Sequence, residues 1–217
     1  MFEIKKAALS EKMELAEGDL ALINAQSLKE LTAEEVFTFR VAACNDEVDR
    51  DYERFPVETL QKMAPMFVGK TMICDHRWSA GNQQARIYKA EVDQADGLNR
   101  LVVSAYMLRT VSNSDTIAAI SGGILREVSV GCAISRVKCS ICGKDAHECP
   151  HFRGEHYEGQ VCHYDLLDPV DAYELSFVAV PAQPKAGVIK NKNNSSWSPS
   201  ELEREKARLR IEHERWK

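Results

Sequence analysis

The sequence predicts an α+β protein built on a mainly antiparallel β-barrel, closed or partly closed, with helices at its periphery. Many short runs of alternating apolar and polar residues indicate strands, and only a few helical segments lie between them. Such alternation leaves one face of each strand apolar, which favours antiparallel pairing. The 217 residues contain no internal repeat and no sustained β-α-β rhythm, so a doubly wound parallel sheet is not expected.

The clearest strand signals are VFTFRVAA (36–43), KTMICDHRW (70–78) and DAYELSFVAVPA (171–182). Residues 85–108 hold two further alternating runs separated by DQADGLN, and the Asp-Gly pair in that connection is typical of a tight hairpin. The stretch GILREVSVGCAIS (123–135) predicts another strand. These runs supply the expected walls of the barrel.

Helices are expected at residues 27–36, 56–67 and 112–125. Pro56 suits the first turn of the second helix, and the third has a capping-type start and a Gly-Gly stop. The chain then divides into an N-terminal polar and helical segment (1–33), a barrel domain (34–190), a linker (191–200) and a charged C-terminal helix (201–217).

The overall charge and hydropathy exclude several classes of protein. A net charge of −5 argues against nucleic acid as the main partner, because phosphate binding normally needs a basic excess. No run of about 18 apolar residues predicts a membrane-spanning helix, and the first twenty residues lack the apolar core of a signal peptide. A cytoplasmic protein is therefore expected.

The seven cysteines do not suggest a disulfide framework, because an odd number in a reducing compartment favours thiols and metal ligands. Three lie singly in apolar runs and are expected in or near the core: Cys44, Cys74 and Cys132. The other four crowd together in an insertion at residues 138–164, which breaks every periodicity.

The insertion contains CSICGKDAHECPH, a C-x2-C followed by a C-x-H. This spacing predicts a closed, structural zinc site whose ligands are Cys139, Cys142, Cys149 and His151. Gly143 suits the tight turn after the first pair. The fourth ligand has alternatives in His147, His156, Cys162 and His163, and a thiol-rich loop without metal is the alternative to the whole site.

The strand at 123–135 has one ordinary face and one nearly empty face. Its valines and isoleucine share one side, while the other carries only Ser129, Gly131, Ala133 and Ser135. Small side chains suit a close backbone contact or a tight barrel interior. They would equally leave room for a substrate beside a reactive serine.

Two other residues are candidates for chemistry. His76 is expected to end its strand on the same face as Met72 and Cys74, half-buried, where a neutral imidazole accepts a proton. A rim histidine without a catalytic role is the alternative. Glu174 is a single strand glutamate, and such residues usually face solvent. Nothing in EVSVG matches G-x-S-x-G, so an α/β-hydrolase is excluded.

Three stretches in this order, MICDHRW, LREVSVGCAI and YELSFVAVPAQPKAGV, resemble the signature regions of the tailed-phage prohead (capsid maturation) serine proteases, whose fold is similar to herpesvirus assemblin. The resemblance covers residues 36–190 apart from the insertion. It implies that Ser129 is the nucleophile, His76 its general base and Glu174 the residue that orients the histidine. Assemblin relatives use a second histidine in that third role.

The resemblance implies a serine endopeptidase that acts in the host cytoplasm, inside the assembling prohead. Its substrates would be the phage scaffold, extensions of the major capsid protein and the chain itself, with no cofactor required for catalysis. A homo-oligomer, or activity only after assembly, is compatible with this. The alternative is a non-catalytic, zinc-stapled scaffold or assembly protein of the phage head.

Overall fold

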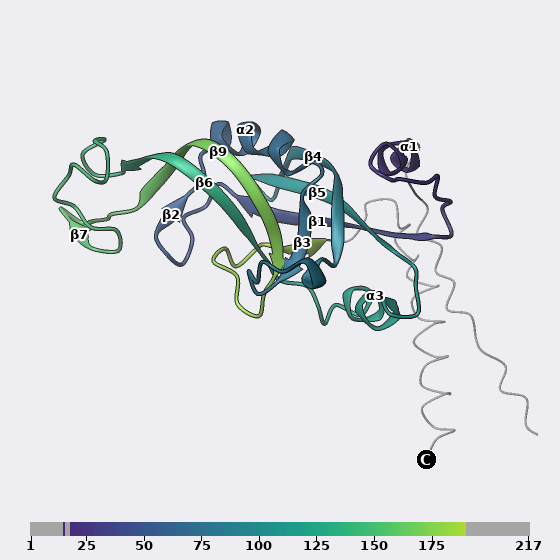
Figure 1. Ribbon diagram of the computed structural model, residues 1–217. Helices are drawn as coiled ribbons and strands as arrows, with labels where there is room; N and C mark the ends of the chain where they lie inside the picture. The colour runs from purple at the N-terminus through teal and green to yellow at the C-terminus, as the bar shows by residue number, and fades with distance from the viewer. Residues whose placement is uncertain (1–14, 16–17, 190–217) are drawn as a thin grey trace, which may run out of the picture.

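A mixed sheet of eight strands organises the chain (Figure 1). The computed structural model describes Leu15 and residues 18–189, so the expected linker at 191–200 and the charged helix at 201–217 lie outside the described residues. The strands pair in the order β10-β1-β5-β4-β3-β9-β2, and β6 pairs with β9 off this path. The predicted α+β class is confirmed.

The sheet consists of β1 (Val36–Asn45), β2 (Glu53–Arg54), β3 (Thr71–Cys74), β4 (Ala85–Ala95), β5 (Leu98–Leu108), β6 (Val128–Cys139), β9 (Tyr164–Phe177) and β10 (Gly187–Ile189). A separate two-stranded ribbon consists of β7 (His156–Tyr157) and β8 (Gln160–Val161). The helices are α1 (Asp19–Asn24), α2 (Val57–Phe67), α3 (Ser114–Ser121) and the 3-10 turn η1 (Ala80–Asn82).

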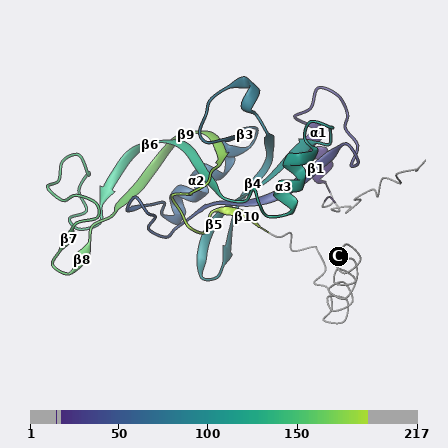
Figure 2. The ribbon, with the colours of Figure 1, turned by 90° about the horizontal axis from the view of Figure 1, so that it is seen from below.

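The sheet is open, and its strand pairing does not close into the expected barrel. One isolated antiparallel bridge joins Glu127, just before β6, to Gly187 in β10. The amide of Val188 also donates to the carbonyl of Arg126 at 2.9 Å. Beyond this point β6 and β9 continue as a long antiparallel pair, the β6–β9 arm, toward the insertion (Figures 1 and 2), and β2 joins the other side of β9 at Tyr164 and Asp165. In the described part of the chain, residues 129–136 of β6 therefore pair with β9 alone.

Local sequence signals explain the hairpin and two of the helices. The β4–β5 hairpin turns at Asp96 and Gly97, both with positive φ, as a tight two-residue turn requires. Helix α2 begins after Pro56 and buries one face against the sheet, where Thr59 Oγ1 donates to the carbonyl of Leu166 at 2.8 Å. Helix α3 ends at its Gly-Gly pair. These three predictions are confirmed.

The helix predicted at residues 27–36 is wrong. The chain there is irregular and enters β1 at Val36, while a short helix, α1, precedes it. Side chains satisfy the local backbone instead: Asn24 bonds both the amide and the carbonyl of Leu31, and Glu35 Oε2 accepts from the amide of Thr32 at 2.9 Å. Such side-chain bonds compete with helix formation.

The core lies between α2 and the apolar side of the sheet. Cys44 is buried there, and Cys74 and Cys132 pack against it, as expected for single cysteines in apolar runs. Burial, followed by the charges of Glu53 and Glu174, raises the pKa of the Cys132 thiol to about 11. That thiol is therefore protonated at neutral pH and poorly suited to act as a nucleophile.

Candidate functional site

His76 reaches the site through a turn in the backbone. Strand β3 ends at Cys74, and the next two residues, Asp75 and His76, both adopt positive φ values (57° and 52°). The expectation that His76 continues the strand on the face of Met72 and Cys74 is therefore wrong, because left-handed residues break the alternation of a strand. The turn is fixed by Asn82, whose amide donates to the carbonyls of Cys74 and Arg77 at 2.9 Å each.

This turn brings the His76 ring onto the carboxylate of Glu174. His76 Nδ1 lies 2.7 Å from Glu174 Oε1. Glu174 lies on β9, which runs parallel to β3, and is only 2% exposed, whereas 43% of the His76 side chain is exposed. A carboxylate only accepts hydrogen bonds, so Nδ1 carries the proton and Nε2 is left as the basic nitrogen. The glutamate is buried rather than solvent-facing.

Ser176 is a member of the site that the sequence analysis missed. Its buried hydroxyl donates to Glu174 Oε2 at 2.6 Å and accepts the backbone N–H of His76 at 3.1 Å. The hydroxyl thus connects the carboxylate to the backbone of the histidine. The signal was present in the strand pattern, because residues two apart on a strand share a face.

Ser129 and Gly131 face this network from β6. The antiparallel register of β6 and β9 places Ser129 opposite Ser176 and Gly131 opposite Glu174. A Cβ atom at position 131 would lie 2.2 Å from Glu174 Oε1, so only glycine fits beside the carboxylate. On the nearly empty face of this strand, Gly131 is therefore required by a close contact. Ser129 on the same face has only the small Ser176 opposite it.

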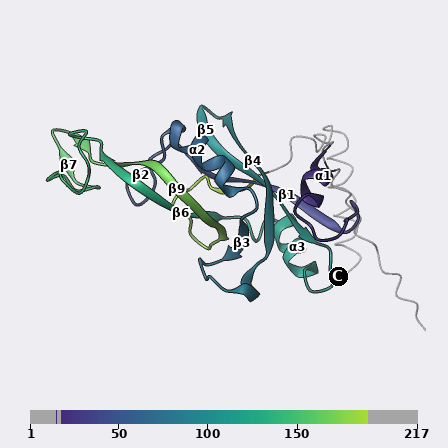
Figure 3. The ribbon, with the colours of Figure 1, turned by 45° about the horizontal axis from the view of Figure 1, so that its top comes forward.

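The structure thus brings His76, Ser129 and Glu174 to one region where β3, β9 and β6 lie side by side (Figure 3). The hydrogen bonds of the described site run from His76 through Glu174 to Ser176 and do not include the Ser129 hydroxyl. A histidine held by a buried carboxylate at Nδ1, with a hydroxyl nearby, is the arrangement used for nucleophilic catalysis by serine.

The second cluster lies at the far end of the β6–β9 arm. Cys139, Cys142, Cys149 and His151 have ligand atoms that all lie within 4.8 Å of one another, so this cluster could hold a metal ion such as zinc. Cys139 is the last residue of β6. In the turn that follows, Gly143 has a φ of 71° and its backbone N–H donates a hydrogen bond to the carbonyl of Cys139. The predicted ligands are therefore brought together.

One distance within this cluster matches the spacing of ligands around a tetrahedral zinc ion. Zinc–sulfur bonds of about 2.3 Å place two ligand atoms roughly 3.5–3.8 Å apart, and Cys139 Sγ lies 3.8 Å from His151 Nδ1. Burial raises the pKa of Cys139, but hydrogen bonds from the amides of Cys142 and Ile141 and from neighbouring thiols outweigh it and lower that pKa to about 6. A thiolate is the form that binds metal.

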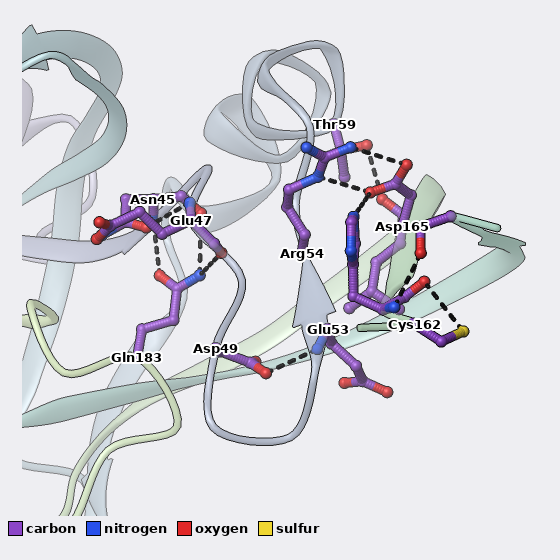
Figure 4. A network of polar contacts seen from close by, with 12 residues as sticks. Asn45, Glu47, Asp49, Glu53, Arg54, Thr59, Cys162, Asp165 and Gln183 are labelled. Carbon is purple, nitrogen blue, oxygen red and sulfur yellow. Dashed lines mark hydrogen bonds and ion pairs between the residues drawn. The ribbon is translucent and has the colours of Figure 1, made fainter. Parts of the chain in front are cut away.

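Among the alternative ligands, Cys162 lies beside the four-residue cluster, with its Sγ 3.8 Å from Cys139 Sγ. The three other histidines of the insertion, His147, His156 and His163, are not members of the cluster. Where the insertion joins β9, Arg54 on β2 bonds both oxygens of Asp165, at 2.6 and 3.0 Å (Figure 4). Arg153 pairs with Glu53 beside it.

A cavity of about 350 Å³ lies beside β6 and is lined by residues of that strand, by Leu166 of β9 and by Ala43 and Cys44 of β1. The residues that line it include the apolar Val130, Cys132 and Phe55, the acidic Asp49 and Glu53, and Ser129. Burial raises the pKa values of Asp49 and Glu53 from their ordinary values. The loop that bears these carboxylates is fixed by Asp49 Oδ1, which accepts the amide of Glu53 at 2.8 Å (Figure 4).

Comparison of the chain with protein-family models, with curated proteins and with solved structures found no match. Within the described residues, no helix is both long and apolar enough to cross a membrane. The function proposed for the chain consequently depends on the geometry of its two clusters and on the motifs in its sequence.

Proposed function

We propose that this chain is a serine endopeptidase of phage head maturation. The observation that carries the proposal is the 2.7 Å contact between His76 Nδ1 and a Glu174 carboxylate that is almost fully buried. A carboxylate buried without a cationic or hydrogen-bonding partner is costly, so a glutamate held in this way against a histidine favours a functional pair. The motif resemblance assigns the same residues to catalysis.

Each residue then has a defined role. Ser129 Oγ attacks the carbonyl carbon of the scissile peptide while His76 Nε2 takes the hydroxyl proton. Glu174 keeps the imidazole in the Nδ1–H form and stabilises the imidazolium without taking its proton. His76 returns the proton to the leaving amine, and water then hydrolyses the acyl-enzyme by the same route.

The unpaired edge of β6 suits an extended peptide. Within the part of the chain that the structure describes, backbone groups at residues 129–136 pair with no strand other than β9, and Ser129, Val130 and Cys132 of this stretch also line the 350 Å³ cavity. A substrate can add there as an extra strand, with its scissile bond beside Ser129. The bridge between Glu127 and Gly187 joins the segment just before β6 to β10, the strand at one end of the sheet. This contact supports a partly closed barrel.

Zinc in the Cys3His cluster would have a structural role. Cys139, Cys142, Cys149 and His151 would hold it, and these four donors complete a tetrahedral set with no position for a substrate. The ion would fold an insertion that contains few apolar residues and fix the end of the β6–β9 arm. The chemistry at Ser129 needs no cofactor.

The biological setting follows from the motif resemblance. The protease would act in the host cytoplasm inside the assembling prohead and cleave the scaffold, the extensions of the major capsid protein and itself. A homo-oligomer is compatible with this setting. Neither a membrane nor nucleic acid is the proposed partner.

The test is co-expression with the scaffold and major capsid proteins of the same phage, followed by intact-mass spectrometry. The matched variants are Ser129→Ala and Ser135→Ala, which remove two hydroxyls from the same strand. Ser135 Oγ donates to the carbonyl of Asp168 at 2.9 Å, outside the site. Trimmed products that vanish only with Ser129→Ala support the protease, whereas identical masses from all three chains in assembled heads exclude it.

A second candidate is a non-catalytic, zinc-stapled assembly protein of the phage head. The observation in its favour is the Cys3His cluster at the tip of an arm that projects from the sheet (Figure 1). For such a protein, Ser129→Ala leaves head assembly unchanged, whereas Cys142→Ser prevents incorporation into heads. The protease shows the opposite dependence on Ser129.

A further inference from the structure

A recess of about 380 Å³ opens beside Glu174, on the side of the site away from the β6 edge. Trp78 and Tyr173 form its aromatic wall, with ring centroids 5.3 Å apart and planes inclined at 60°. Thr71 and Ile73 of β3 also line it. Its volume lies toward the low end of ligand pockets, which span roughly 300–1,000 Å³.

The two aromatic residues are direct neighbours of the proposed catalytic pair. Trp78 follows His76 by two residues in the loop that Asn82 holds in place, and Tyr173 immediately precedes Glu174. The register of β6 and β9 skips Tyr173, which makes it the extra residue of a β-bulge. Bulges beside active sites commonly re-aim a side chain, as this one directs Tyr173 toward Trp78.

Exposure distinguishes these rings from ordinary core aromatics. Trp78 is 70% exposed and Tyr173 is 42% exposed, and their rings contact each other edge to face. Large aromatic side chains that remain unburied are the type that dominates binding energy at interfaces. The recess therefore offers apolar surface that a ligand can cover.

The walls of the recess present no uncompensated charge to a ligand. Glu174 is buried and engaged by His76 and Ser176. The ammonium group of Lys70 lies 2.9 Å from a carboxylate oxygen of Asp171. A charged ligand side chain would lose hydration here without gaining an unpaired partner, whereas an apolar one loses nothing.

We infer that this recess is a specificity subsite for a large apolar side chain, aliphatic or aromatic, of the peptide substrate, close to the scissile bond. The inference rests on the proposed function only where it takes the ligand to be a peptide substrate. The preference for apolar side chains depends on Trp78 and Tyr173. Glu174 both lines the recess and holds His76, so a substrate side chain that extends from the β6 edge across Ser129 and His76 meets the recess at Glu174. Stacking on Trp78 then selects for size and apolarity.

The binding test uses Trp78 as its own reporter. Trp197 and Trp216, which lie outside the described residues, are changed to Phe in a full-length Ser129→Ala chain, so that Trp78 is the sole tryptophan. This chain is titrated with capped hexapeptides Ala-Ala-X-Ala-Ala-Ala, where X is Leu, Phe, Ala, Asp or Lys. We expect Leu and Phe to bind about tenfold more tightly than Ala and to change the Trp78 emission. Equal affinities, no binding, or a preference for Asp or Lys overturns the subsite.

A cleavage test separates this inference from the proposed function. A peptide library prepared from a proteome is digested with the unaltered chain and with the Ser129→Ala, Trp78→Ala and Trp78→Phe variants, and the new termini are sequenced by mass spectrometry. We expect enrichment of large apolar residues at one position near the cut, lost with Trp78→Ala and kept with Trp78→Phe. Ser129-dependent cleavage without that enrichment overturns the subsite and leaves the protease. Apolar peptide binding without Ser129-dependent cleavage, both in this digest and in the co-expressed, assembled heads, leaves the subsite and removes the protease.

Discussion

The Ser176 hydroxyl lies 2.6 Å from Glu174 Oε2, and both side chains are buried. The same hydroxyl accepts the backbone N–H of His76 at 3.1 Å, so one small side chain orients the carboxylate and fixes the turn that carries the histidine. In the proposed protease Ser176 is therefore a positioning residue, because it touches Glu174 and the backbone of His76 and not the proposed nucleophile.

Ser176→Ala removes both of these bonds. The buried Glu174 oxygen and the His76 amide then lose their partner, which we expect to lower the free energy of unfolding by about 1–3 kcal/mol. Labelling of Ser129 by a fluorophosphonate should slow in parallel and shift in its pH profile. Ser176→Thr, which keeps the hydroxyl, should restore much of the labelling. Urea unfolding and timed labelling measure the two effects, and unchanged labelling in the alanine variant refutes the positioning role.

Gly131→Ala introduces a methyl group where no room exists. Its Cβ would lie 2.2 Å from Glu174 Oε1, so the carboxylate must leave its place beside His76. We expect Ser129-dependent cleavage to fall by at least about tenfold, because the histidine loses its orienting partner. Gly81→Ala is the matched control, since a Cβ there meets nothing within 4 Å. Equal losses in both variants would show that the effect is not local to Glu174.

Glu174→Gln keeps the size of the side chain and removes its charge. The amide no longer stabilises the imidazolium, and its NH2 group favours the wrong tautomer of His76. We expect the rate of Ser129-dependent cleavage to fall about 10²–10⁴-fold. Cleavage kinetics on the scaffold protein measure this, with the circular dichroism spectrum as the control for folding. A variant that cleaves at the normal rate rules out Glu174 as the orienting residue.

The Cys3His cluster predicts one zinc ion per chain. Cys149→Ser should lower the bound zinc and the thermal midpoint, because the insertion loses its metal-linked folding energy. His147→Ala is the control, since His147 is not a member of the cluster. Zinc content by elemental analysis and melting with and without a chelator measure the effect. If Cys149→Ser keeps its zinc and Cys162→Ser loses it, Cys162 is the ligand in place of Cys149.

Asp168 predicts a small dependence of stability on pH. Hydrogen bonds from Lys62 and then Arg136 lower the pKa of this carboxyl below its usual value of 3.8. A lowered native pKa contributes stability that is fully present above 3.8 and disappears as the pH falls through the native value. Asp168→Asn, which still tolerates the positive φ at this position, should therefore be less stable than the natural chain at pH 7 and equal to it at very low pH. Urea midpoints at several pH values test this, and a pH-independent difference contradicts it.

The sequence by itself determined the elements whose signals are local. The Asp-Gly turn predicted the β4–β5 hairpin, and Pro56 predicted the start of α2. The C-x2-C…C-x-H spacing predicted which four residues form the Cys3His cluster. Ligand spacing of this kind is readable because a tight knuckle and a short loop fix the geometry within about a dozen residues.

Only the tertiary structure decided how the candidate active site is arranged and that the sheet is open instead of closed into a barrel. His76 and Glu174 are 98 residues apart, and their contact depends on two left-handed residues after β3, which alternation cannot foresee. The hydrogen bonds of Ser176 and the close approach of Gly131 to Glu174 both depend on the register of β6, β9 and β3. Strand register depends on packing between distant segments, and that is why a single sequence specifies the strands more readily than their neighbours.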